Sequence, residues 1–353
     1  MLATVLLYAW LSQAAGVGGD RPNVEKAMAL ISAGKLDAAA AMLSDLETAD
    51  PKDPDPPYRL GLVLLKQGKL EESRGHLERA AALDPNRPLT RAALGLLHNS
   101  IGHAAAALND APTAAREFQE AIHIDPSRPI YYLNLAQLLV DHETPEPAEV
   151  VLQNALKRFP RNPDVLRLLG LASFAQGKNR QALEAFLQAI DAVPDSESAY
   201  ASLEVLLPDA GPTLPEIVAK LESFSKRHPE SPIGPFLLSL ALPNQSPKQA
   251  EALLRRAIQA SPDFWPAWFG LYKSLKEQEQ PDEAEAALQK TIGLNPDFAP
   301  AHYALAESYN RKGDRARAAQ ERELHHRLLA AQRLAEESHR AQAPRLNYTV
   351  TEH

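Results

Sequence analysis

The stretch LGLVLLKQGKLEESRGHLERAAALDP, from Leu60 to Pro85, decides the fold of this chain. It reads as two short helices, with Gly68 at the turn between them and a proline after the second helix, which proline cannot continue. Two stretches of the same design follow, LLGLASFAQGKNRQALEAFLQAIDAVP (168–194) and YALAESYNRKGDRARAA (303–319). One helix-turn-helix unit therefore repeats along the chain.

Prolines mark the period of this repeat. They are Pro51, Pro85, Pro126, Pro160, Pro194, Pro229, Pro262 and Pro296, at intervals of 34, 41, 34, 34, 35, 33 and 34 residues. Small residues, mostly Ala and Gly, recur at fixed distances before each proline. Two antiparallel helices approach closely only where a contact side chain is small, so this phase predicts helix pairs stacked into a solenoid.

These residues resemble the tetratricopeptide repeat family, and the resemblance covers residues 20 to 330 approximately. It implies an all-α, right-handed α-solenoid of about nine helix pairs. Each pair would bury its apolar face on its neighbours, which leaves a surface suited to holding other molecules. We therefore expect a non-enzymatic scaffold that binds a protein or peptide.

Two departures from the 34-residue period divide the expected array of repeats into segments. The 41-residue interval contains seven extra residues near 104–110, which either lengthen a helix by almost two turns or form a loop around Asp110. Eight prolines between 208 and 247 predict shortened helices. We expect an N-terminal array at 20–196, degenerate units at 197–264, C-terminal units at 265–342 and a tail at 343–353.

The two ends of the chain carry separate predictions. Leu2 to Leu11 is a short apolar run followed by small residues, which favours a signal peptide at 1–16; an N-terminal capping helix and a membrane anchor are the alternatives. With the signal, the protein would be bacterial and periplasmic or secreted, and otherwise cytoplasmic. Asp314 to Gln342 predicts one long helix, either a polar cap for the solenoid or a helix that pairs with a partner.

Composition excludes several classes of function. The net charge of −8 argues against a nucleic-acid partner, and cysteine is absent, so no thiolate metal site is expected. Beyond residue 16 we expect no integral membrane span. The histidine pairs 98/103 and 325/326 do not align two imidazoles on one helical face. The chain lacks phosphate-loop, dinucleotide and hydrolase motifs, so we expect no enzyme, cofactor or metal.

The family resemblance implies that the first helix of each pair lines the concave face. In that register the candidate partner-binding residues are Tyr58, Leu62, Leu133, Asn134, Gln137, Arg167, Leu171, Phe269, Lys273, Tyr303, Glu307 and Asn310. Family members that bind chaperone tails place Lys and Asn at comparable positions, and no such pair stands here. The alternative function is a ligand- or carbohydrate-related accessory protein that uses the aromatic cluster Phe264–Tyr272.

Overall fold

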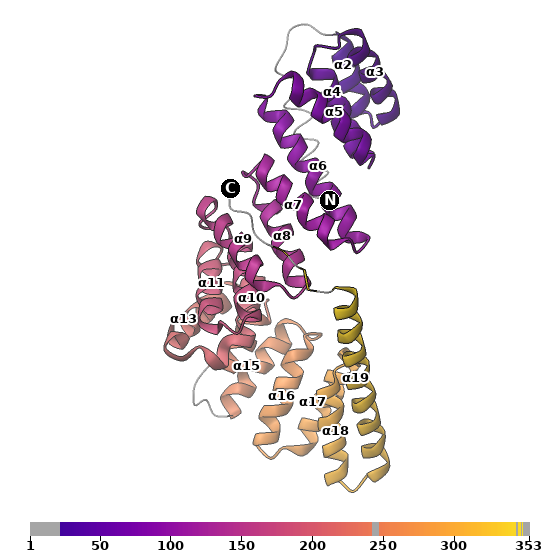
Figure 1. The fold of residues 1–353 in the computed structure, drawn as a ribbon. Coiled ribbons are helices and arrows are strands. Elements are labelled where there is room, and N and C mark those ends of the chain that lie inside the picture. The colour runs from indigo at the N-terminus through magenta and orange to yellow at the C-terminus, as the bar shows by residue number, and fades with distance from the viewer. Residues whose placement is uncertain (1–21, 242–246, 344, 347, 349–353) are drawn as a thin grey trace. The chain divides into compact units, whose positions relative to one another are not determined.

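The computed structural model describes residues 22–241, 247–343, 345, 346 and 348, and these form an all-α solenoid with the expected nine helix pairs (Figure 1). In chain order the pairs are α2 (Pro22–Ser32) with α3 (Leu36–Ala49), α4 (Asp55–Lys66) with α5 (Leu70–Leu83), α6 (Pro88–Ala107) with α7 (Ala111–Ile124), α8 (Pro129–Asp141) with α9 (Pro145–Arg158), α10 (Pro163–Ala175) with α11 (Asn179–Ala192), α12 (Glu197–Ala201) with α13 (Leu214–Arg227), α14 (Ile233–Ala241) with α15 (Pro247–Ala260), α16 (Trp265–Glu277) with α17 (Pro281–Leu294), and α18 (Ala299–Arg311) with α19 (Arg315–Gln342). Two 3₁₀ helices, η2 (Glu204–Asp209) and η3 (Gly211–Thr213), separate α12 from α13.

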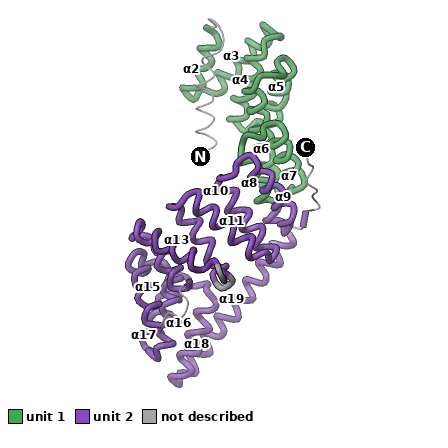
Figure 2. Tube along the Cα trace, turned by 90° about the vertical axis from the view of Figure 1, so that its left-hand side faces the viewer, with its two compact units in different colours: residues 1–138, 351–353 green, residues 139–350 purple. Residues whose placement is uncertain are grey.

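The chain divides into two compact units, shown in different colours in Figure 2. Unit 1 comprises residues 1–138 and 351–353, and unit 2 comprises residues 139–350. The division falls within α8, inside the segment for which the sequence predicted one continuous array. The expected signal segment at 1–16 lies outside the described residues. Across the described helices, none combines the length and apolar composition that a bilayer span requires.

Close helix crossings explain the small residues of the repeat. A Cβ atom on Gly61 would lie 2.5 Å from Cγ of Leu77, and one on Gly170 would lie 2.3 Å from Cε1 of Phe186. Leu77 and Phe186 are fully buried in the second helix of each pair. The glycine therefore allows a large side chain of the second helix to fill the space against the first, as the sequence predicted.

Among the turns that the structure describes, seven pairs have a left-handed residue in the turn between their helices, and glycine supplies it in four of them. Their φ angles are 73° at Gly34, 76° at Gly68, 71° at Gly177 and 81° at Gly313. Non-glycine residues adopt the same conformation in three other pairs: Asn109 (58°), Glu143 (52°) and Glu279 (57°). The turn geometry is thus kept even where the sequence signal for it is lost.

The seven extra residues lengthen a helix, which was the first of the two predicted outcomes. Helix α6 has 20 residues, whereas α10, the first helix of a regular pair, has 13. Its partner α7 keeps the usual length of 14 residues. Gly102 still meets Phe118 in the α6–α7 crossing, because seven residues add almost two whole turns and preserve the apolar face.

The prediction of shortened helices between 208 and 247 is met only in part. Within that segment η3 has 3 residues and α14 has 9, but α13 keeps the usual 14. The short helices α12, with 5 residues, and η2, with 6, begin before it. Leu203 and Leu206 of the α12–η2 stretch and Phe224 of α13 are buried in the main core cluster of unit 2. The irregular pair is therefore part of the continuous core of its unit.

Helix α19 is the long C-terminal helix that the sequence predicted. It is the second helix of the last pair and packs on α18. Ala318 is buried, whereas most of the other described side chains of the helix are exposed. Near the C-terminal end of α19, Arg340 Nε lies 3.0 Å from Glu143 Oε1. Arg345 Nη2 lies 3.0 Å from Glu146 Oε2. Both ion pairs lie within unit 2 and join its last segment to the turn before α9 and to the first turn of α9.

Candidate functional site

The candidate site is a cavity of about 980 Å³ in the last repeats of unit 2. First helices α16 and α18 line it, and α19 adds one side chain. The lining residues are Phe269, Tyr272, Lys273, Lys276, Glu277, Pro300, Tyr303, Ala304, Glu307 and His325. Four of the predicted residues, Phe269, Lys273, Tyr303 and Glu307, therefore line one cavity.

Two aromatic rings of α16 each lie beside a lysine ammonium group that follows one turn later. Lys273 Nζ lies 4.8 Å from the centre of the Phe269 ring, and Lys276 Nζ lies 5.8 Å from the centre of the Tyr272 ring. The two rings are 5.6 Å apart between centroids. Cation–π contacts of this kind hold each ammonium over a ring while leaving its protons available to a ligand. The wall formed by α16 therefore offers apolar surface and hydrogen-bond donors together.

The opposite wall of the cavity is built around Tyr303. Its side chain is 51% exposed, and its ring centroid lies 5.3 Å from that of His325. The Nδ1 atom of His325 donates to the Ala299 carbonyl at 2.9 Å, because a carbonyl oxygen can only accept. This bond fixes the imidazole beside Tyr303. The tyrosine face is thus positioned in advance but remains open to solvent.

The charge of Lys273 also acts on Glu204 in η2, which does not line the cavity. Partial desolvation of the Glu204 carboxyl raises its pKa, and the nearby Lys273 ammonium opposes that rise. Glu277 and Glu307 add carboxylates to the lining. The cavity therefore carries both signs of charge around an aromatic surface, an arrangement that binds and orients a ligand.

Tyr58 and Leu62 are buried, so the expectation that they lie on an open concave face is wrong for both. They are 0% and 1% exposed. The guanidinium of Arg87, at the start of the next pair, lies 4.4 Å from the centre of the Tyr58 ring. Burial raises the pKa of Tyr58 to about 12. The neighbouring repeat covers this position, which the register of a single repeat does not reveal.

A buried ion network holds Arg87 in that place. The Asp55 carboxylate accepts from Arg59 Nε at 2.5 Å and from Arg87 Nη2 at 2.6 Å. Burial alone would raise the pKa of Asp55, but the hydrogen bonds from the two guanidinium groups outweigh it and lower that pKa. The network is structural, since its members are largely enclosed by unit 1.

The predicted residues of α8 belong to unit 1 or its boundary, and they form a polar network. Asn134 Nδ2 donates to Asn99 Oδ1 at 2.7 Å and to His103 Nε2 at 3.0 Å. Because Nε2 accepts here, His103 is the neutral tautomer with its proton on Nδ1, and burial lowers its pKa. Leu133 is half-buried beside this network and Gln137 is exposed.

The remaining predicted residues do not join the cavity. Arg167 is half-buried in α10, and Leu171 packs against the core of unit 2. Asn310 is exposed at the end of α18, where its Oδ1 accepts from Arg322 Nη2 at 3.4 Å. Conversely, sequence reasoning missed Lys276, which follows Lys273 by one turn, and His325, which α19 supplies from outside the register.

The aromatic cluster Phe264–Tyr272 does not form one surface. Phe264 packs edge-on against Phe236 at 5.3 Å, and Trp265 stacks on Phe298 at 4.6 Å. Trp268 Nε1 donates to the Pro262 carbonyl at 2.9 Å, and its ring lines a different depression. Only Phe269 and Tyr272 of the cluster face the candidate cavity. These rings therefore serve mainly the packing of successive repeats.

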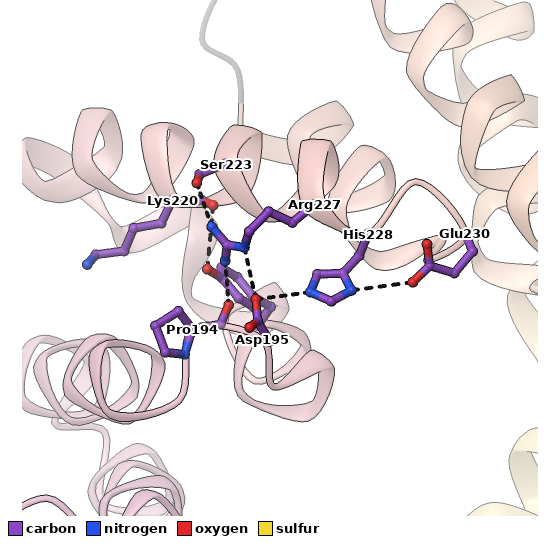
Figure 3. A network of polar contacts seen from close by, with 8 residues as sticks. Pro194, Asp195, Lys220, Ser223, Arg227, His228 and Glu230 are labelled. Atoms are coloured by element: carbon purple, nitrogen blue, oxygen red, sulfur yellow. Dashed lines mark hydrogen bonds and ion pairs between the residues drawn. The ribbon is translucent and has the colours of Figure 1, made fainter.

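A second group of titratable side chains lies at the irregular pair, and Figure 3 shows it from close by. Asp195 Oδ1 accepts from Arg227 Nε at 2.9 Å and from His228 Nε2 at 3.0 Å. His228 Nδ1 lies 3.3 Å from Glu230 Oε1. The hydrogen bond to Asp195 is the main cause that raises the pKa of His228. Arg227 Nη2 also donates to the Pro194 carbonyl at 2.8 Å, so the network fastens the end of α13 to the turn after α11.

Metal chemistry has no suitable cluster in the part of the chain that the structure describes. Within those residues, no three His, Asp or Glu side chains approach one another closely enough to share an ion. The histidines considered from the sequence have other contacts: His98 Nδ1 lies 2.7 Å from Glu117 Oε2.

Comparison with known proteins places the repeat pattern in a family. Two models, each described as tetratricopeptide repeat, match residues 30–97 with 241–292 and residues 133–197 with 273–323. Together these ranges cover more than half of the chain. No curated protein matched.

Several solved structures are similar to this chain at low sequence identity. Yeast Tom70 is 16% identical, with 91% of this chain and 88% of Tom70 covered at a TM-score of 0.50. The APC/C hetero-tetramer Cut9–Hcn1 is 15% identical, covering 87% of this chain and 59% of that chain at a TM-score of 0.49. YrrB, described as a tetratricopeptide repeat protein with an unusual peptide-binding site, is 21% identical and covers 64% of this chain and 98% of its own at a TM-score of 0.36.

Proposed function

This chain belongs to the tetratricopeptide repeat family, whose fold supports a role as a protein-interaction scaffold, and we propose that its last repeats bind a segment of a partner protein in the cavity between α16, α18 and α19. One observation carries the proposal. Tyr303 presents an exposed ring beside two lysines that are already held over aromatic faces. The binding residues are thus in place before the partner arrives.

The chemistry of the cavity defines what it accepts. Phe269, Tyr272 and Tyr303 offer apolar surface to one side chain of the partner. The ammonium groups of Lys273 and Lys276 donate to carbonyl or carboxylate oxygens, and Glu307 accepts from backbone or side-chain donors. Aromatic side chains within reach of charged groups are the common anchors of protein interfaces. A peptide segment with one apolar side chain and flanking polar groups fits this lining.

The test begins with the partner, captured on immobilised protein and identified by mass spectrometry, and then measured with purified components. We expect Tyr303→Ala to weaken binding by about 2 kcal/mol, or roughly 30-fold in Kd. Melting should change little, because half of the Tyr303 side chain is already exposed. Phe174→Ala is the matched control, since Phe174 is 38% exposed in α10 and does not line the cavity. Unchanged affinity for Tyr303→Ala and Lys273→Ala would refute the proposed site.

A further inference from the structure

The two extra turns of α6 create a feature that regular repeats lack. They extend the helix past Gly102 to Ala107, and Leu108 follows as its C-cap. One side of this extension packs on α7 through the Gly102–Phe118 crossing. Another side faces the α4–α5 turn of the preceding pair. Leu108 ends the extension with a side chain that is 82% exposed, the highest exposure among the large apolar residues described.

A groove of about 520 Å³ lies between the α6 extension and that turn. Its apolar part comes from Leu70, Ile101, Ala104, Ala105 and Leu108. Gly68 opens one edge, because nothing lies within 4 Å of the place where its Cβ would be. All of these residues belong to unit 1. The groove is therefore a surface of one compact unit, distinct from the cavity of the last repeats.

Carboxylates predominate among the charged groups that line this groove. Glu71, Glu72 and Asp110 stand against the single ammonium of Lys69. Asp110 is held in place, since its Oδ1 accepts from the Thr113 amide at 3.2 Å. Glu71 lies 3.8 Å from Arg74, which offsets part of its charge. Glu72 is exposed and forms no ion pair in the part of the chain that the structure describes.

We propose that this groove, which we call the α6 groove, binds a short basic segment of a partner protein that also carries an apolar side chain. The apolar side chain would cover Leu108, which is 82% exposed, and this gains free energy by removing apolar surface from water. A lysine or arginine of the segment would meet Glu72 and Asp110, because complementary charge selects the partner and speeds association. The proposal does not depend on the cavity of the last repeats.

Selection from a displayed library of random peptides tests the α6 groove, with counter-selection against the Leu108→Ser variant. The strongest peptide is then labelled and titrated by fluorescence anisotropy at low and high salt. We expect the enriched peptides to combine Lys or Arg with Leu, Ile or Phe. Leu108→Ser should raise Kd by about tenfold, as for a central apolar anchor. Glu72→Gln should raise Kd by a few-fold and reduce the salt dependence, as loss of one charge contact does.

Matched controls keep the result specific. Leu334→Ser removes another leucine that is 67% exposed, and Glu336→Gln removes another exposed carboxylate, both in α19. Neither should change Kd. Circular dichroism and melting confirm that every variant is folded. Tyr303→Ala also should leave Kd unchanged, which separates this groove from the proposed partner cavity.

Four outcomes would overturn the proposal. The selection yields no peptide that depends on Leu108, or the peptides that depend on it are acidic or uncharged. The control variants weaken binding as much as Leu108→Ser does. Alternatively, Leu108→Ser converts a dimer into a monomer in sedimentation, which would assign the groove to a second copy of this chain.

Discussion

Replacing Gly61 by alanine tests the helix crossing on which the whole repeat depends. The added Cβ would lie 2.5 Å from Cγ and 2.7 Å from Cδ2 of Leu77, closer than packed carbon atoms allow. Leu77 is fully buried and cannot turn toward solvent. An extra methyl forced into a packed core costs about 1–3 kcal/mol.

The higher helix propensity of alanine partly offsets this packing cost, so a control substitution has to measure the propensity effect alone. Alanine is favoured over glycine inside a helix by about 0.5–1 kcal/mol. Gly75 supplies the control, because it lies in α5 of the same pair, is exposed, and has nothing within 4 Å of its would-be Cβ. Gly75→Ala should therefore raise the stability by about 0.5–1 kcal/mol, and the difference between the two variants gives the packing cost of about 1–3 kcal/mol.

The assay is urea unfolding followed by the helical circular dichroism signal, with the slope m checked for equality between variants. Gly61→Ala should shift the midpoint down relative to Gly75→Ala. A double variant with Leu77→Ala should show a coupling energy, since removing the leucine side chain makes room for the new methyl. If Gly61→Ala raised the midpoint as much as Gly75→Ala does, α4 and α5 would not cross at Gly61, and the packing argument would fail.

Three further predictions concern packing, titration and local stability. Ala155→Leu and Ala189→Leu, each at a fully buried crossing, should lower the free energy of unfolding by about 1–3 kcal/mol in the same assay, and an unchanged midpoint would contradict the register. The imidazole of His103 should titrate below the ordinary pKa of 6.5 and that of His228 above it, which NMR of the ring protons measures. The His103 contribution to stability is thus present above pH 6.5 and lost as pH falls through its lowered pKa, whereas the His228 contribution is present below pH 6.5 and lost as pH rises through its raised pKa. Amides in 197–213, where helices are short, should exchange before those of α10 and α11, and equal protection would contradict a weak joint.

Periodicity predicted the parts of the fold that repeat. Small residues at fixed distances identified the crossings at Gly61 and Gly170. For the seven extra residues the sequence left a longer helix and a loop open, and the structure has the longer helix. These features are local, so the spacing of residues within one pair determines them. The non-glycine turns at Glu143 and Glu279 escaped prediction because glutamate seldom adopts a positive φ, whereas Asn109 belongs to a residue type that does so more often.

The candidate site was harder to predict, because it depends on neighbours of each repeat. Tyr58 and Tyr303 stand at the same position of their repeats, yet one is fully buried and the other is half exposed. Arg87 of the following pair lies over the Tyr58 ring. Tyr303 belongs to the last pair, and the ring beside it is that of His325 in α19. The position of a residue within its repeat determines which face of the helix its side chain is on. Whether that face is exposed to solvent depends on what the next repeat places over it.

The ion pairs Arg340–Glu143 and Arg345–Glu146 have a consequence for how unit 2 comes apart. A stack of repeats behaves as a one-dimensional system, in which either end frays without involving the other. Here the side chains near the end of the unit meet those near its beginning, so the stack is closed into a loop of about 200 residues. The closure is weak at each contact, because exposed ion pairs contribute roughly 0–1 kcal/mol. Raising the salt concentration should open it without melting a helix, and both ends would then exchange their amides independently.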